Sequence, residues 1–238
     1  MTRVLVVVLL MTIGLSALAA PEVDGPNSPT RLAQLARLPN WTGIWESTGN
    51  SRTIDPAGPP PYNNIWLEKY TKMRAEAPRM VDSYDRYCAA GVPRLMASPE
   101  YFEAMVTPEE TTMVFSQREV RHIYTDGAPH TEADELWPMY WGDSIGHWQG
   151  DTLVADTISI LGKEWLDPTA ATLSDKADIA ERIRMIDPDH LQDRITITDP
   201  QALTRPWSFS RVYRRSSRIN MTDSVCHWGI GTAVKATK

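Results

Sequence analysis

The chain has 238 residues and a formal net charge of −6 at pH 7, and its Lys and Arg residues form no basic stripe. These properties argue against nucleic acid as a partner, because a protein that binds it needs clustered cations to neutralise phosphates. The length suffices for one soluble domain with a sizeable core. Nine Trp and eight Tyr accompany only three Phe. Trp and Tyr join a large apolar body to one polar group, so this composition suits a lined pocket as well as a core.

The first residues have the pattern of a secretory signal peptide. Arg3 supplies a positive charge, residues 4–10 are an unbroken apolar run, and Ala17-Leu18-Ala19 fits the small-x-small cleavage rule. The run is too short to span a membrane, and no other segment is apolar enough to do so. We therefore predict a signal peptide over residues 1–19, cleavage near Ala19, export to the periplasm or the medium, and a single mature domain over 20–238.

Export gives a meaning to the two cysteines, Cys88 and Cys226. In an oxidising compartment an even count favours a disulfide, and the chain-entropy model assigns about 4–5 kcal/mol to the closure of so long a loop. Two lone thiols lack the paired spacing of a zinc site. The sequence predicts a Cys88–Cys226 bond. A catalytic cysteine is the alternative, for which His227 is the one neighbouring base.

The mature chain begins with two short elements. Leu32, Leu35 and Leu38 have helical spacing, and residues 40–46 are predicted to form a first strand.

A proline-rich segment follows the predicted first strand. The prolines of residues 52–63 cannot continue a ladder. A helix is predicted over 65–77, with Pro78 at its end, and a short helix near 99–105. We interpret residues 52–108 as a Pro-rich, partly helical insertion.

From residue 111 the pattern changes to strands joined by short turns. The predicted strands are 111–117, 119–125, 145–148, 152–158, 178–186, 191–199 and 207–215. Gly150 supplies the turn angle of one predicted hairpin, and residues 187–190 form the turn of the next. Many strands with few helices between them favour a mainly β fold, an antiparallel meander that closes into a barrel, with the insertion covering one mouth.

Alternation along the strands places charged residues on buried faces. Arg211 shares its face with three aromatic residues, and Glu181 and Asp193 lie on the apolar faces of the two preceding strands. An isolated buried charge is costly, so we expect Arg211 to be paired with Glu181 or Asp193. A structural ion pair and a ligand-binding group are both open as its role.

Gly43-x-Trp45 on the predicted first strand resembles the lipocalin (calycin) signature. In that family the Trp packs across the barrel floor against an Arg from near the last strand. The resemblance implies that Arg211 or Arg214 has this place here, and that the barrel holds one small, mostly apolar ligand. The insertion over 52–108 departs from that family.

Longer motifs cover most of the mature chain. They are Cys88…Gly91-Val92-Pro93-Arg94, Ile123-Tyr124-Thr125-Asp126-Gly127, Gly142-x-Ser144-x-Gly146-x-Trp148-x-Gly150-Asp151-Thr152-Leu153-Val154-x-Asp156-Thr157 and Asp199-Pro200…Pro206-Trp207. Together they resemble a family of secreted proteobacterial proteins. The resemblance implies export and a β-rich body, and it assigns no mechanism.

Residues 121–157 concentrate groups that can transfer protons. His122, His130 and His147 lie here, but no pair has the tight HxH or HxxxH spacing of metal ligands, so no metal is expected. Residues 142–146 match G-x-S-x-G, but a nucleophile elbow needs a strand, a turn and a helix. A hairpin follows here, so we interpret the match as chance.

Acid/base chemistry remains. We predict His122 as acid or base, Tyr124 and Arg121 as groups that stabilise a substrate oxygen, Asp126 as the residue that orients the imidazole, and His147 as a second acid or base. The predicted ligand-binding residues are His130, Trp137, Tyr140, Asp143, Trp148, Glu181 and Arg211. The alternative is that these are ordinary surface residues of a meander.

We therefore expect a cofactor-independent periplasmic enzyme, of lyase or isomerase type, that acts on a small aromatic or terpenoid-like molecule. Two alternatives stay open, a non-catalytic binding protein for a similar ligand and a structural envelope protein. The sequence does not indicate an oligomeric state or a substrate.

Overall fold

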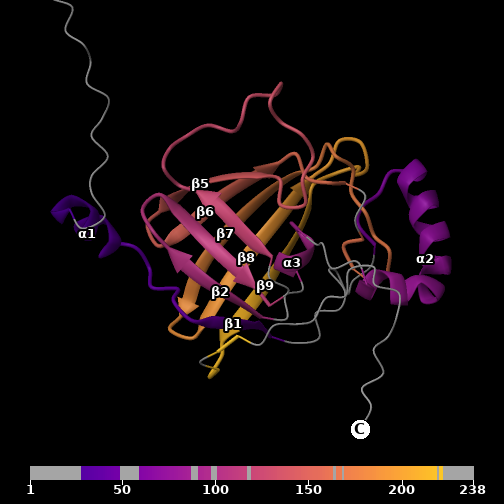
Figure 1. Cartoon of the computed structure of the whole chain (residues 1–238). Coiled ribbons are helices and arrows are strands. Elements are labelled where there is room, and N and C mark those ends of the chain that lie inside the picture. Colours follow the sequence, from indigo (N-terminus) through magenta and orange to yellow (C-terminus); the bar gives the residue numbers. More distant parts are fainter. Residues whose placement is uncertain are drawn as a thin grey trace, which may run out of the picture.

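The structure is a computed structural model that describes residues 28–48, 59–86, 91–97, 101–116, 119–162, 165–167, 169–218 and 220–221. The helices are α1 (Pro29–Leu35), α2 (Asn64–Arg86) and α3 (Arg94–Ala97). The strands are β1 (Ile44–Ser47), β2 (Tyr101–Val106), β3 (Glu110–Phe115), β4 (Val120–Tyr124), β5 (Asp143–Gln149), β6 (Thr152–Ile158), β7 (Asp178–Asp187), β8 (His190–Thr198) and β9 (Trp207–Arg215). They form a closed barrel in sequence order, in which β9 pairs back with β1 (Figure 1). The predicted mainly β fold and barrel closure are confirmed.

One strand pair departs from an antiparallel meander. β4 and β5 run parallel, with Tyr124 opposite Ile145, whereas the other pairs of the barrel are antiparallel. A parallel pair needs a long connection that returns the chain to its starting end. Residues 125–142 provide that connection, and they form a long loop over the barrel wall (Figure 1).

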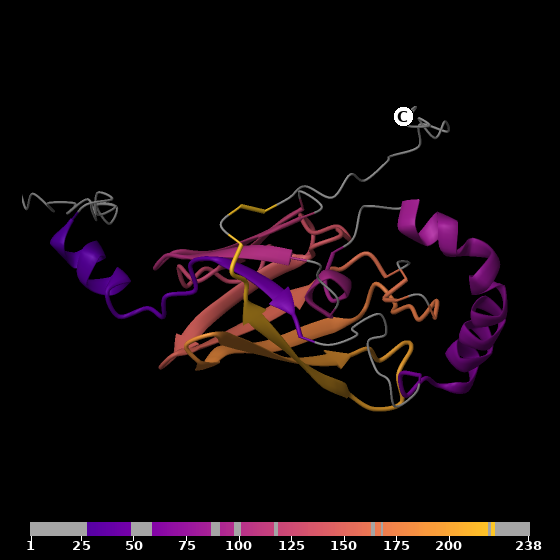
Figure 2. The ribbon, with the colours of Figure 1, turned by 90° about the horizontal axis from the view of Figure 1, so that it is seen from below.

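Two predictions for the insertion are wrong. Residues near 99–105 form strand β2 rather than a short helix, because Phe102 and Ala104 alternate into the core and both β1 and β3 pair with the strand. Helix α2 does not stop at Pro78 but continues to Arg86. A proline inside a helix removes one backbone hydrogen bond and bends the axis, and α2 is visibly curved (Figure 2).

Trp45 closes one end of the barrel. It is fully buried on β1, and the Arg215 guanidinium lies over its ring, 4.4 Å from the centroid. Arg215 also donates to the Thr42 carbonyl oxygen. The arginine against the tryptophan is therefore Arg215, and the expectation of Arg211 or Arg214 is wrong. Arg215 is the β9 residue directly paired with Trp45, whereas Arg214 forms an ion pair with Glu46.

The opposite end of the barrel carries the helices of the insertion, as expected (Figures 1 and 2). In α3, Leu95, Met96 and Ala97 are buried. The chain just before α3 packs tightly against the long loop, since a Cβ at Gly91 would lie 1.5 Å from the Tyr140 carbonyl oxygen. Only glycine fits at that position.

Two predictions lie outside the described residues. These are the signal peptide over 1–19 and the Cys88–Cys226 disulfide. Within the described part of the chain, no helix combines the length and the apolar character needed to cross a bilayer.

Candidate functional site

Strand β4 divides the predicted catalytic residues between the two faces of the barrel wall. Side chains alternate along a strand, and here Arg121 and Ile123 point inward and are fully buried. His122 and Tyr124 point outward, and Tyr124 is 46% exposed. A substrate inside the barrel could therefore meet Arg121 but neither His122 nor Tyr124.

The outward residues lie on an open surface. His122 Nδ1 lies 3.0 Å from Glu110 Oε2, and its ring stacks on Tyr124 with the centroids 6.1 Å apart. Asp126 accepts a hydrogen bond from the Ala128 amide at 3.0 Å. Asp126 thus stabilises a turn, and no contact between it and His122 is found among the described residues.

The remaining predicted residues lie in separate places. His147 is exposed and contacts Gln149. Trp137, 65% exposed, and Tyr140 belong to the long loop, whereas Trp148 points into the barrel and meets Trp41 edge-on at 5.3 Å between centroids. They do not form one aromatic pocket.

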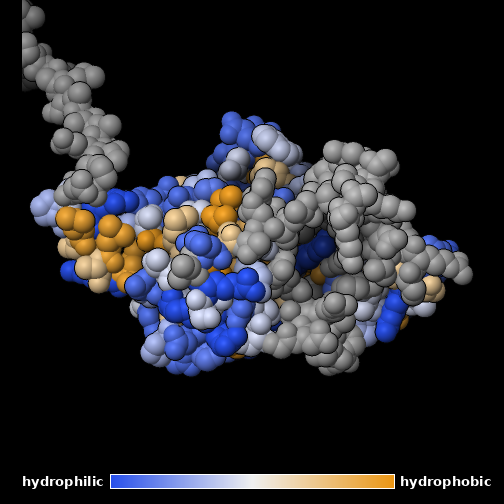
Figure 3. Space-filling model, turned by 60° about the horizontal axis from the view of Figure 1, so that its bottom comes forward, coloured by the Kyte–Doolittle hydropathy of each residue, from blue (hydrophilic) through white to orange (hydrophobic). Residues whose placement is uncertain are grey.

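Exposed apolar surface gathers on the side of the molecule that carries α1 (Figure 3). Leu32 of α1 is 51% exposed, and Met105 of β2 is 46% exposed. Met105 lies opposite Thr112, and Thr112 lies opposite His122, so this surface adjoins the outer wall that carries His122.

His130 anchors the long loop to the barrel wall. Its Nδ1 lies 3.0 Å from Asp143 Oδ2 on β5, and its Nε2 lies 3.0 Å from Asp156 Oδ2 on β6. Asp143 also accepts the Thr131 amide at 2.8 Å. Carboxylates only accept, so both His130 contacts are hydrogen bonds when both ring nitrogens carry a proton. The sequence analysis predicted His130 and Asp143 as ligand-binding residues. In the structure, both residues join the long loop to the barrel wall.

A buried ion pair crosses the barrel interior. Arg121 on β4 donates to both carboxylate oxygens of Glu181 on β7, at 2.9 and 2.5 Å, and to Thr157 Oγ1 at 3.1 Å. Ser144 Oγ lies 2.8 Å from the same Thr157 oxygen. Both charged side chains are fully buried. The expected pairing of Arg211 with Glu181 is therefore wrong, because Arg121 holds both oxygens of that carboxylate.

Asp193 on β8 lies beside this pair and is fully buried. Among the described residues, no group donates a hydrogen bond to either of its carboxylate oxygens. Burial raises the pKa of Asp193 well above its ordinary value, and the charge of Glu181 raises it further, while the charge of Arg121 opposes the shift. A protonated Asp193 could donate to Glu181, which would satisfy both groups. The environment therefore favours the neutral acid.

Tyr213 and Arg211 on β9 connect this interior to α3. Tyr213 Oη donates to the Met96 carbonyl oxygen, and Arg211 Nε donates to the Ala97 carbonyl oxygen at 2.6 Å. Burial, then the charge of Asp193, raises the pKa of Tyr213 well above its ordinary value. Arg211 lies opposite Asp193 in the β8–β9 register, and its guanidinium donates hydrogen bonds to the main-chain oxygens of Ala97 and Ser210.

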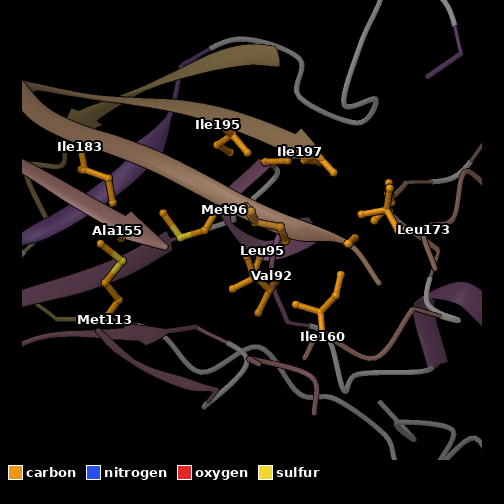
Figure 4. Packing of buried hydrophobic residues seen from close by; sticks show 14 of the residues in the cluster. Val92, Leu95, Met96, Met113, Ala155, Ile160, Leu173, Ile183, Ile195 and Ile197 are labelled. Carbon is orange, nitrogen blue, oxygen red and sulfur yellow. The ribbon is translucent and has the colours of Figure 1, made fainter. Parts of the chain in front are cut away.

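We call Arg121, Glu181, Asp193 and Tyr213 the interior cluster. It combines an acid, a carboxylate, a fixed cation and a phenol, all fully buried. Met96, Met113, Ala155, Ile183 and Ile195 supply apolar side chains around the interior (Figure 4). Across the described ranges, no three His, Cys, Asp or Glu side chains gather closely enough to hold a metal ion.

Sequence reasoning assigned Arg121 and Glu181 to different functional sets and left Asp193 and Tyr213 out of the site. Polar side chains at inward positions of strands were the available signal. Comparison of the chain with protein-family models and with curated proteins finds no match, so its chemistry is argued from its own residues.

Proposed function

We propose that the protein is an acid/base enzyme that acts inside the barrel on a small, largely apolar molecule with a carbonyl or hydroxyl group. The supporting observation is Asp193, a fully buried carboxyl group with a raised pKa and no donor on either oxygen. A carboxylic acid kept neutral by its surroundings can donate a hydrogen bond or a proton to a substrate oxygen.

The neighbouring groups suit proton transfer without redox chemistry. Asp193 would protonate the substrate oxygen, and Glu181 would accept a proton from the adjacent carbon, so that no proton is gained or lost overall. Arg121 would stabilise the charge that passes between the two carboxyl groups. Such a transfer is the core of an isomerase or a lyase, and it needs only the side chains of the chain.

Desolvation favours this interior cluster over the predicted outward residues. Charged groups act more strongly on each other where water is excluded. His122 and Tyr124 lie on the outer wall, where water screens them. Their predicted catalytic role stays a prediction that the same experiment tests.

One observation favours a second candidate, a non-catalytic protein that binds a similar ligand. Both oxygens of Glu181 already accept hydrogen bonds from Arg121, which weakens Glu181 as a base. In that case Asp193 would donate a hydrogen bond to the ligand and no bond would change.

Deuterium exchange tests the two candidates. The purified protein is incubated in D₂O with small aromatic and cyclic ketones, beginning with acetophenone and cyclohexanone, and incorporation next to the carbonyl is followed by NMR. We expect Asp193→Asn to lower exchange about 10²–10⁴-fold, the usual contribution of an acid/base group. His122→Ala and His147→Ala serve as controls on the outer wall and should retain the wild-type rate.

Each result has one reading. Equal exchange by wild type and Asp193→Asn would refute the role of Asp193, and loss in His122→Ala would favour the outer site. Binding of a ketone without exchange would support the binding protein. Neither binding nor exchange across the panel would favour a structural protein.

We also propose that the protein acts in the periplasm after cleavage near Ala19. The charged start, the apolar run and the small-x-small motif support this location. Mass spectrometry of the protein from the periplasmic fraction tests it, since cleavage after Ala19 would leave a chain that begins at Ala20.

A further inference from the structure

Helix α3 closes the barrel beside the interior cluster. Arg121, Glu181 and Asp193 have no exposed surface, so no water-sized space adjoins these three side chains. A ligand can reach them only if part of the surrounding protein moves. α3 is the smallest element at that end, with four residues.

The contacts of α3 are of two kinds. The Met96 side chain is fully buried and reaches from α3 into the barrel near Met113, Ala155 and Ile183 (Figure 4). The second kind is polar. A helix leaves its last carbonyl groups without partners inside the helix, and here the carbonyl oxygens of Met96 and Ala97 accept hydrogen bonds from β9.

One of the two donors, Tyr213, belongs to the interior cluster, and the other, Arg211, lies two residues before it on β9. The donor to Met96 is the hydroxyl of Tyr213, whose surroundings include Asp193 and Glu181. Ile183, which lies near Met96 in Figure 4, is directly paired with Asp193 across β7 and β8. An apolar side chain and an acceptor oxygen of α3 therefore lie next to the interior cluster, on the side of Tyr213 and Ile183.

We propose that α3 fills the ligand position of the barrel and that the ligand resembles what it displaces. The Met96 side chain occupies the place of the ligand's compact apolar body, and the Met96 and Ala97 carbonyl oxygens occupy the places of two acceptor oxygens of the ligand. This inference rests on the proposed function and narrows its ligand to a small ester, a lactone or a similar molecule with two acceptor oxygens. A ligand of that kind restores the packing and the hydrogen bonds that displacement of α3 breaks.

Truncation of the Met96 side chain on α3 tests the inference without knowledge of the natural ligand. Met96→Ala removes the side chain that fills the barrel, and binding of γ-butyrolactone and of cyclopentane is measured by ligand-observed NMR. We expect Met96→Ala to bind the lactone at least tenfold more tightly than wild type does, and to prefer it to cyclopentane. Asp193→Leu in the Met96→Ala background should abolish that preference, because no hydrogen-bond donor is left at this position.

A matched control separates recognition from cavity filling. Leu173→Ala opens space at a buried residue between β6 and β7, away from Met96 (Figure 4), and it should bind cyclopentane at least as well as the lactone. If Met96→Ala does not fold, Met96→Val is compared in the same way. Equal binding of both probes by the truncated variant, a lactone preference that survives Asp193→Leu, or no binding at all would overturn the inference.

Failure of this inference is distinct from failure of the proposed function. Asp193-dependent deuterium exchange with no lactone binding by Met96→Ala would support the proposed enzyme and would show that its ligand does not occupy the position of α3. Lactone binding without deuterium exchange in any variant would support the proposed ligand position and would refute the catalytic step.

Discussion

The ion pair between Arg121 and Glu181 gives a sharp prediction about stability. Arg121→Met keeps most of the side-chain volume and removes the guanidinium. Glu181 would then lose both of its charge-assisted hydrogen bonds and remain fully buried. Its carboxylate must either stay charged without a counter-ion or take up a proton, and both cost free energy. Thr157 is less affected, because Ser144 still contacts its hydroxyl.

The magnitude follows from the burial of both partners. Removal of one partner of a buried ion pair costs about 3–5 kcal/mol, whereas replacement of both by apolar residues of similar volume is often neutral or stabilising. For a domain of this size, about 2–4 °C in Tm corresponds to each kcal/mol. We therefore expect Arg121→Met and Glu181→Leu each to lower Tm by about 6–20 °C, and the double variant to regain most of that loss.

A double-mutant cycle provides the assay. Urea denaturation followed by tryptophan fluorescence gives the free energy of unfolding for wild type, both single variants and the double variant. Arg31→Met is the matched control, because Arg31 makes the same bidentate contact with Glu109 in an exposed pair. We expect little change in that control, since water screens surface pairs.

Two results would refute this reasoning. One is a loss below about 1 kcal/mol in Arg121→Met, the value typical of a surface pair. The other is a double variant whose loss equals the sum of the two single losses, which would mean that Arg121 and Glu181 do not stabilise each other.

Three further predictions concern pH, the barrel floor and the long loop. Folding raises the pKa of Asp193, so the contribution of Asp193 to stability is greatest at low pH and is lost as pH rises through the raised pKa. Asp193→Asn should remove this part of the pH dependence of the free energy of unfolding, measured by urea titration at pH 5 and 8. Identical pH dependence in the variant and the wild type would contradict the assignment. Arg215→Met should cost about 1–2 kcal/mol in thermal unfolding, since it removes the cation from the Trp45 ring, and no loss would mean that this contact contributes nothing. Gly142 and Gly127 both have positive φ, but of the two only Gly142 has a carbonyl oxygen 2.4 Å from the position of an added Cβ. Gly142→Ala should therefore lower Tm more than Gly127→Ala does. Equal losses in Tm would show that backbone strain alone determines the cost of these substitutions.

Local patterns predicted the strands well where alternation was strong. The last strand was predicted at its observed bounds because aromatic residues occupy three of the four alternate positions from Trp207 to Tyr213. The same alternation placed Arg121 and His122 on opposite faces of β4. It also carried the signal that distinguishes Arg215 from Arg214, because Arg215 shares its face with Tyr213.

Non-local pairing explains what the sequence could not predict. The partner of Glu181 is Arg121, 60 positions away, and only closure of the barrel brings β4 opposite β7. Residues near 99–105 became a strand because β1 and β3 pair with them, which outweighs local propensity. The parallel pairing of β4 with β5 likewise depends on the path of a long loop, and no local pattern encodes that path.

Energetic cost helps to decide where function lies in this fold. A barrel interior can be filled with apolar side chains alone, and a buried ion pair adds little stability over such packing. Asp193 adds a third buried ionisable group, and no donor to its oxygens is found in the described part of the chain. Such a group costs stability, and a functional role would explain its presence. His122 and Tyr124, by contrast, cost little on an exposed wall. If Asp193→Asn or Asp193→Leu stabilises the fold while it abolishes deuterium exchange or lactone recognition, Asp193 is present for function at a cost in stability. If both variants stabilise the fold and leave ligand binding and exchange unchanged, the interior cluster has no role in function.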